Sequence, residues 1–227
     1  MTKNKLQRFE ENLSFPNLFQ PSYDDLLEKP FSLKGKWRTD FFKNNHPIVL
    51  ELACGKGEYT VGLAKRHPNV NFIGIDRQGA RVWRGCKTSN DENLVNVAFL
   101  RTQIQYIDLL FAKDEVDEIW ITFPDPQPKK SKLKRRLTSQ NMLERYAKVL
   151  KPDGIVHLKT DSVFFTDFTL EVIEENKHLL QFCTHDLYHE YPDMEVASIQ
   201  TFYEQIWLNQ GLKIHYLKFQ LHPSMFK

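Results

Sequence analysis

The chain has 227 residues, 41% of them hydrophobic and 13% aromatic, which supports a packed core and excludes a mainly disordered chain. The sequence shows no apolar run of the roughly 18–20 residues that span a membrane, and it shows no secretory signal. Its three cysteines have no CxxC spacing, so neither a disulfide framework nor a zinc knuckle is expected. These features favour a cytoplasmic protein. The net charge is only +2, yet six positive charges lie in the acid-free run Lys129–Arg136, which predicts a local anion-binding feature rather than general affinity for polyanions.

The first 45 residues show no sustained hydrophobic period. Pro16, Pro21 and Pro30 interrupt a mixture of polar and aromatic residues, which is typical of an irregular segment. We therefore expect residues 1–45 to form an N-terminal arm or extension that a partner could order. The remaining residues, 46–227, are expected to form one domain.

From residue 47 onward, short β-rich runs alternate with amphipathic helical segments. This alternation predicts an α/β fold in which a mostly parallel seven-stranded sheet is covered by helices on both faces. The segment Lys151-Pro152-Asp153-Gly154 is typical of a turn that ends a helix. The expected strands are residues 48–52, 70–75, 94–100, 118–123, 155–159, 180–184 and 213–221, and the expected helices are residues 59–67, 79–87, 104–111, 139–150, 162–175 and 203–208.

Polar and glycine residues follow several of these strands directly. In an open α/β sheet, ligands bind outside the carboxyl ends of the strands, and a carboxylate there is costly unless a ligand or cation uses it. The alternative, a helix N-cap, is natural for Asp161, weaker for Asp76 and weakest for Asp125, which has a proline on each side. The residues expected at this edge are Gly55, Gly57, Asp76, Asp125 and Asp161.

The loop after the first expected strand, E-L-A-C-G-K-G from Glu51 to Gly57, indicates the kind of cofactor. A dinucleotide fingerprint needs a third glycine, and that position is Thr60. Glu51 and Glu58 bracket the loop with negative charge, which favours a cationic group over a phosphate. With Asp76 after the second strand, the pattern resembles the S-adenosylmethionine site of Rossmann-like methyltransferases.

A second motif is more specific. The segment T-F-P-D-P-Q-P-K-K-S-K-L-K-R-R-L, residues 122–137, resembles the signature of the bacterial tRNA (guanine-N7-)-methyltransferase family. The resemblance continues in the K-T-D of residues 159–161 and the T-F-Y-E of residues 201–204, and it extends over about residues 35–220. It implies transfer of a methyl group from S-adenosylmethionine to N7 of a guanine in the tRNA variable loop, position 46 in that family.

The resemblance also implies roles for individual residues. Asp125 would be the active-site carboxylate. The substrate nucleotide would contact Lys129, Asp161, Thr201, Phe202, Tyr203 and Glu204, and the cofactor would contact Glu51, Gly55, Gly57 and Asp76. Two positions depart from the family pattern: Gln127 replaces a tryptophan, and Gln103 replaces the acid that contacts adenine. An amide can both accept from and donate to adenine, so Gln103 stays in the expected cofactor site.

The expected chemistry requires no strong base. N7 of guanine has an in-plane lone pair, so positioning and electrostatics would supply the catalysis. Asp125 would hold the guanine edge and face the positive charge that develops on the ring. The basic run would bind tRNA phosphates, which supply affinity rather than base identity.

Other functions remain as alternatives. An adenine or cytosine amino-methyltransferase would carry a second adjacent proline and an aromatic residue after Asp125, and neither is present. A non-catalytic RNA-binding module that retains the fold would have lost its cofactor residues, which are present. His185 and His189 have a spacing that could bind metal on a helix, but Pro192 favours a loop there, so no metal is expected. The oligomeric state, monomer or homodimer, is left open.

Overall fold

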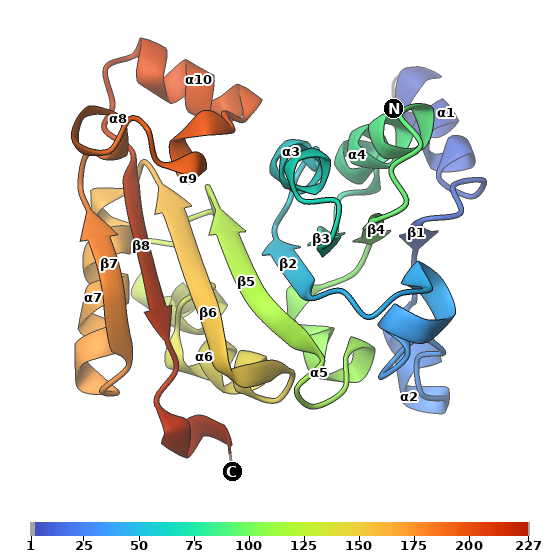
Figure 1. Ribbon diagram of the computed structural model, residues 1–227, viewed down its shortest axis with the longest axis horizontal. Coiled ribbons are helices and arrows are strands. Elements are labelled where there is room, and N and C mark those ends of the chain that lie inside the picture. Colours follow the sequence, from blue (N-terminus) through green and yellow to red (C-terminus); the bar gives the residue numbers. More distant parts are fainter. Residues whose placement is uncertain (1–2, 227) are drawn as a thin grey trace.

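The computed structural model describes residues 3–226 and contains one eight-stranded sheet with the strand order β1-β4-β3-β2-β5-β6-β8-β7 (Figure 1). All neighbouring strands are parallel except β8, which runs antiparallel to both β6 and β7. The expected α/β class with a mostly parallel sheet is confirmed, with one strand more than the seven expected. The strands are β1 (Leu18–Phe19), β2 (Ile48–Leu52), β3 (Asn71–Ile75), β4 (Val97–Leu100), β5 (Val116–Thr122), β6 (Leu150–Thr160), β7 (Leu179–Thr184) and β8 (His215–Gln220).

Helices cover both faces of the sheet, as the buried central strands require. Every residue of β2, β3 and β4 is buried, which is typical of parallel strands enclosed on two sides. One face packs against α3 (Glu58–Arg66) and α4 (Gly79–Asp91), and the other against α5 (Ile107–Leu110), α6 (Gln140–Ala147) and α7 (Val163–Glu175). The short helices α8 (Leu187–Glu190), α9 (Glu195–Ser198) and α10 (Phe202–Asn209) lie beyond the carboxyl ends of β5 and β6.

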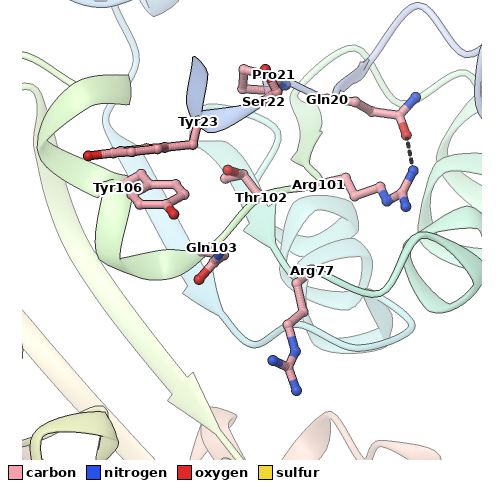
Figure 2. Close-up of a pocket in the computed structure, with 9 residues that line it drawn as sticks. All are labelled: Gln20, Pro21, Ser22, Tyr23, Arg77, Arg101, Thr102, Gln103 and Tyr106. Atoms are coloured by element: carbon pink, nitrogen blue, oxygen red, sulfur yellow. Dashed lines mark hydrogen bonds between the residues drawn. The ribbon is translucent and has the colours of Figure 1, made fainter. Parts of the chain in front are cut away.

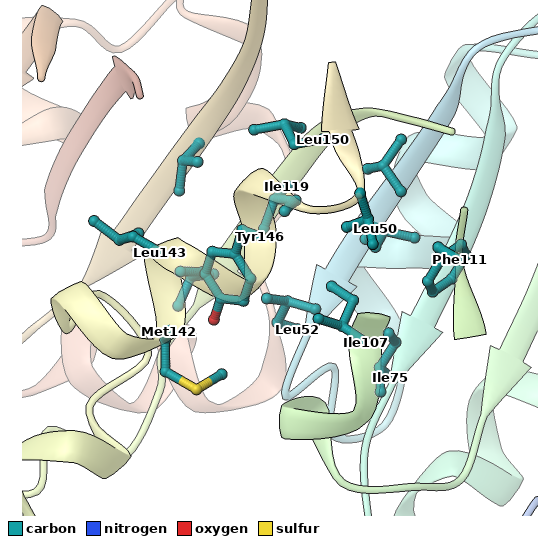
Figure 3. Close-up of a cluster of buried hydrophobic side chains, with 14 of the residues drawn as sticks. Leu50, Leu52, Ile75, Ile107, Phe111, Ile119, Met142, Leu143, Tyr146 and Leu150 are labelled. Atoms are coloured by element: carbon teal, nitrogen blue, oxygen red, sulfur yellow. The ribbon is translucent and has the colours of Figure 1, made fainter. Parts of the chain in front are cut away.

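The core beneath α5 and α6 is formed by apolar side chains that recur at helical spacing in these two segments. Ile107 and Tyr146 project from the two helices onto Leu50 and Leu52 of β2 and Ile119 of β5 (Figure 3). The Tyr146 hydroxyl is buried and donates to the backbone carbonyl of Leu137 over 2.9 Å. This packing fixes the two central strands relative to each other, and so fixes the loops that leave their carboxyl ends.

The N-terminal segment belongs to the packed structure, which corrects its interpretation as an irregular arm. It contributes α1 (Lys3–Glu11), strand β1, α2 (Tyr23–Glu28) and the π-helical turn η1 (Trp37–Phe42). Trp37 is fully buried and stacks on Phe111 with ring centroids 5.6 Å apart, and β1 extends the sheet beside β4. Because a two-residue strand has no readable period, the sequence pattern could not reveal it. The division into residues 1–45 and 46–227 stays a prediction, and residues 1, 2 and 227 lie outside the described range.

Strand β6 starts earlier than expected. The composition of Lys151–Gly154 predicts a turn, but the segment lies within β6, and the pairing with β5 shifts there from Val116–Leu150 to Glu118–Ile155. Asp117, on β5, accepts hydrogen bonds from Arg38 and Lys151 and from the backbone of Ile48. These contacts hold the irregular stretch against the sheet, so a turn-like composition is accommodated as a bulge in a strand. No helix within residues 3–226 is both long and apolar enough to span a membrane.

Candidate functional site

The glycine loop between β2 and α3 contains two glycines in the left-handed region, for different reasons. Gly57 has φ +69° and starts α3, and a Cβ there would lie 2.6 Å from the Phe99 ring, so this glycine serves internal packing. Gly55 has φ +57°, and a Cβ would meet only the Ala53 carbonyl oxygen, at 4.0 Å. Gly55 therefore leaves space at the carboxyl edge where a ligand can approach the backbone.

Glu51 lies beneath this loop and is buried. Its Oε2 accepts hydrogen bonds from the backbone N–H and the hydroxyl of Thr60, and its Oε1 accepts from the hydroxyl of Thr122. Burial nevertheless raises the pKa of Glu51 to about 7, because desolvation of the charge outweighs these three donors. A buried carboxylate near its pKa at neutral pH gains strongly from a neighbouring cation, which fits the ammonium group of a bound amino acid.

Asp76, directly after β3, ties the loops that follow β2 and β3 together. Its Oδ2 accepts from the Gly55 N–H over 3.0 Å, and its Oδ1 accepts from the Gln78 N–H over 2.7 Å. Each carboxylate oxygen keeps a second lone pair. Asp76 therefore braces the loop and still has acceptor capacity for the hydroxyl groups of a ribose.

Gln103 lies in the loop that follows β4 and lines a pocket of about 350 Å³ (Figure 2). The side chains of Tyr23 and Tyr106 stack in this pocket with ring centroids 4.7 Å apart, and Arg77 follows Asp76 into it. The N-terminal segment forms one wall, from Gln20 to Tyr23. Sequence reasoning missed Tyr23 because this segment carried no period that would place it against the sheet.

Asp125 follows β5 on a rigid loop and is exposed to solvent. Its Oδ1 accepts from the Gln127 N–H over 3.1 Å, and both Phe123 and Gln127 adopt positive φ. Such left-handed residues are uncommon outside glycine and are retained only where the surroundings enforce them. The loop turns so that Asp125 faces outward.

Arg136 enforces that conformation from below, which corrects the expectation that the whole basic run binds phosphate. It is 5% exposed, and its guanidinium lies over the rings of Phe164 and Phe168 at 4.6 and 4.3 Å. It donates to the carbonyl oxygens of Gln127 and Pro128. Arg136 is therefore a loop anchor, whereas the other five cations of the run, Lys129, Lys130, Lys132, Lys134 and Arg135, are exposed or half-buried.

The segment that contains residues 201–204 is anchored by a buried ion pair. The ammonium of Lys159 lies 2.6 Å from Glu204, and both side chains are fully buried. Lys159 also donates to the carbonyl oxygens of Val196 and Ile199. Glu204 and Thr201 form a reciprocal cap at the start of α10. Glu204, which the family resemblance places among the substrate contacts, therefore lies beneath the surface that would meet the substrate.

Phe202 and Tyr203 are the exposed part of that segment, at 49% and 42%. The Phe202 N–H donates to Glu58 over 2.9 Å, and the Lys56 ammonium lies 3.9 Å from the Phe202 ring centroid. These contacts join the segment to the glycine loop. Although they are far apart in the sequence, the two segments form adjoining parts of one surface.

Asp161 follows β6, next to the end of β5 that leads to Asp125, and it is half-buried. The hydroxyl of Ser162, rather than the carboxylate of Asp161, caps α7 by accepting from the Phe165 N–H. The N-cap alternative for Asp161 is therefore wrong. Among the residues that the structure describes, no group of three or more His, Cys, Asp or Glu side chains is arranged to hold a metal ion.

The fold and the glycine loop together define a class: Rossmann-like methyltransferases that use S-adenosylmethionine. A family model described as "Putative methyltransferase" matches residues 45–217. The structure resembles that of the 16S rRNA methyltransferase KamB, with a TM-score of 0.61 and 17% identity over 89% of this chain and 94% of the other, which shows the shared fold.

Sequence relatives narrow this class. The tRNA (guanine-N(7)-)-methyltransferase of Christiangramia forsetii is 56% identical over 97% of this chain and 99% of its own length. The enzyme of the same name from Bacteroides thetaiotaomicron is 52% identical over 97% of this chain and 87% of its own length. The chain belongs to the tRNA (guanine-N7-)-methyltransferase family, as its motifs indicated.

Proposed function

We propose that the chain methylates N7 of the guanine at position 46, in the variable loop of tRNA, and that it does so in the cytoplasm, a location that its tRNA-modifying relatives support. One observation supports the site most strongly: Asp125 is held outward on a rigid loop at the same sheet edge as the buried Glu51 and the glycine loop. An exposed hydrogen-bond acceptor for a nucleobase therefore lies on the same sheet edge as the residues that suit a cationic cofactor.

The residues on the β2–β4 side fit S-adenosylmethionine. Glu51 would stabilise its ammonium group, Asp76 would accept from its ribose hydroxyls, and Gln103 would face its adenine. Because Gly55 and Gly57 have no side chains, the loop projects little above the sheet edge. The space beside Gly55 would admit the methionine part of the cofactor. When bound, the cofactor supplies an electrophilic methyl group on a sulfonium.

The residues on the β5–β6 side would hold the guanine. Asp125 would accept hydrogen bonds from N1–H and the exocyclic amine of the guanine, and its negative charge would offset the positive charge that the ring gains as N7 attacks the methyl group. Asp161, Lys129 and Thr201 would line the approach of the nucleotide, and the exposed rings of Phe202 and Tyr203 would be available for stacking. No proton has to leave N7, so Asp125 is a positioning and electrostatic group rather than a base.

Glu204 has a different place in this proposal from the other substrate residues. Because it is buried against Lys159, it would act by orienting Thr201, Phe202 and Tyr203. The exposed cations of the basic run would bind tRNA phosphates on the α6 side of the edge.

Nucleoside mapping tests the proposal directly. Purified protein, S-adenosylmethionine and a tRNA transcript with guanine at position 46 should yield 7-methylguanosine, which mass spectrometry of nuclease fragments would place in the variable loop. A matched transcript with adenine at position 46 should gain none. Methylation of another base, or of a guanine outside the variable loop, would contradict the proposal.

A further inference from the structure

A second basic surface lies on the opposite side of the sheet edge from the run Lys129–Arg136. A cleft of about 380 Å³ is lined by Arg8 of α1, Lys56 of the glycine loop, and Arg81 and Arg84 of α4. We call it the α1–α4 cleft. Its cations come from three segments separated by dozens of residues, so no charge run in the sequence marks it.

Positive charge outweighs negative charge in this cleft. Glu58 is the one carboxylate among its lining residues, and that side chain accepts from the Phe202 N–H, while the Glu11 carboxylate lies against Trp83 in the floor. None of the four cations forms an ion pair with any residue in the described range 3–226. A cluster of like charges in a concave site repels itself unless an anion neutralises it.

The floor of the cleft is rigid, which favours a built site over a chance cluster. Trp83 of α4 donates from Nε1 to Glu11 of α1 over 2.6 Å, and the Arg8 guanidinium lies 4.6 Å from its ring centroid. Arg81 and Arg84, three residues apart on one helix face, remain exposed beside this anchored pair. Guanidinium groups on a fixed support are suited to bidentate contacts with phosphate oxygens.

Lys56 connects the cleft to the guanine side of the site. Its ammonium lines the cleft and also lies over the Phe202 ring. We propose that the α1–α4 cleft binds the phosphate backbone of the tRNA, as a second contact region on the α3–α4 side of the edge. This inference rests on the proposed function. A polyanion that crosses the edge then meets positive charge on both sides of Asp125.

The test compares the salt dependence of tRNA binding in two double variants. Arg81→Ala with Arg84→Ala removes two exposed cations of the cleft. Lys36→Ala with Lys113→Ala removes two exposed cations near the amino end of β5, far along the sheet from the site. The slope of log Kobs against log salt should fall in magnitude by about 1.4–1.8 in the cleft variant, since each phosphate contact contributes about 0.7–0.9. It should stay unchanged in the control.

Binding of S-adenosylhomocysteine, measured by calorimetry, separates the remaining outcomes. The cleft variant should bind it with wild-type affinity, which also shows that the fold is intact. An unchanged salt slope would overturn the inference, and so would lost cofactor affinity with normal tRNA binding. If the wild-type protein methylates position 46 but the cleft variant keeps its slope, only this inference fails. If the wild type does not methylate tRNA there, the proposed function itself fails.

Discussion

On the β2–β3 side of the sheet edge, Glu51 and Asp76 are buried and hydrogen-bonded within the protein, whereas on the β5–β6 side Asp125, Phe202 and Tyr203 face solvent. The first side matches a small cofactor of constant shape, for which the polar groups can be set in advance. In the proposed function, the second side has to admit a nucleotide that is part of a large RNA. The exposed residues of this side are held in position by buried contacts beneath them.

Two buried cations provide that support. Lys159 holds the segment of residues 201–204, and Arg136 holds the Asp125 loop. Neither cation is exposed enough to bind RNA, although both belong to the family-like motifs. A positively charged residue within a family motif can therefore stabilise the fold and take no part in the binding surface.

The largest effect is expected at Lys159. Lys159→Ala leaves Glu204 charged, buried and unpaired, and breaking such a pair costs about 3–5 kcal/mol of unfolding free energy. Urea denaturation measures the loss. Glu204→Gln, which keeps the shape and some hydrogen bonding, should cost less. A stable Lys159→Ala variant that also kept full activity would show that the pair does not support the substrate side.

At Asp125 the effect should appear in the rate alone. Asp125→Ala removes the acceptor for the guanine edge and should lower the single-turnover rate by about 10²–10³-fold, comparable to the loss of one group that stabilises a transition state. Asp125→Asn should lose less. Affinity for S-adenosylhomocysteine should not change. A variant as fast as the wild type would remove Asp125 from the mechanism.

A substitution of Asp76 tests the β2–β3 side of the sheet edge. Asp76→Ala should weaken cofactor binding by about 1.5–3 kcal/mol, because charge-assisted hydrogen bonds to the ribose are lost along with the brace on Gly55. tRNA affinity should be almost unchanged. Calorimetry with S-adenosylhomocysteine and a filter-binding assay with tRNA measure the two quantities. Normal cofactor affinity would mean that the cofactor lies elsewhere.

A smaller effect should distinguish Arg136 from the exposed cations of its own run. Arg136→Ala loosens the loop and should slow methylation at saturating tRNA by about 5–30-fold, equivalent to about 1–2 kcal/mol of lost stacking and hydrogen bonding, with the salt slope unchanged. Lys130→Ala with Lys134→Ala should instead reduce the slope, by about 1.4–1.8. Arg136→Lys should not restore the rate, since an ammonium lacks the planar stacking face. The same slope change in both variants would refute the anchor role.

The smallest expected effect is the pH dependence of cofactor affinity and of stability that arises from Glu51. An ammonium beside this carboxylate favours its ionised form, so cofactor binding should release a proton near the pKa of about 7, and affinity should fall by up to tenfold per pH unit below it. In the free protein the folded state binds this proton more tightly than the unfolded state does. The unfolding free energy should therefore fall as pH rises from about 4.5 to about 7, and level off above.

Calorimetry at pH 6.5 in buffers of different ionisation enthalpy measures the proton release, and urea denaturation across pH measures the stability. Glu51→Gln should abolish both dependences. Cofactor affinity that is independent of pH in the wild type would place the ammonium away from Glu51.

Much of this architecture could be read from local sequence. Short apolar runs and amphipathic segments indicate the strands, and the carboxyl ends of parallel strands necessarily share one edge. The sequence alone therefore predicts that Gly55, Asp76, Asp125 and Asp161 lie at that edge. The motif around Asp125 further indicated the family. These features depend on neighbours in the chain or on a rule that holds for every parallel sheet.

Tertiary structure decided what depends on contacts between distant segments. Strand β1 pairs only because the edge of β4 is available, and the α1–α4 cleft exists only because α1 packs against α4. Burial turned Arg136 and Glu204 from expected RNA contacts into anchors, since Phe168 and Lys159 reach them from other elements. A charge in a sequence has no fixed role, because its free energy is set by the solvent and the partners that the fold supplies.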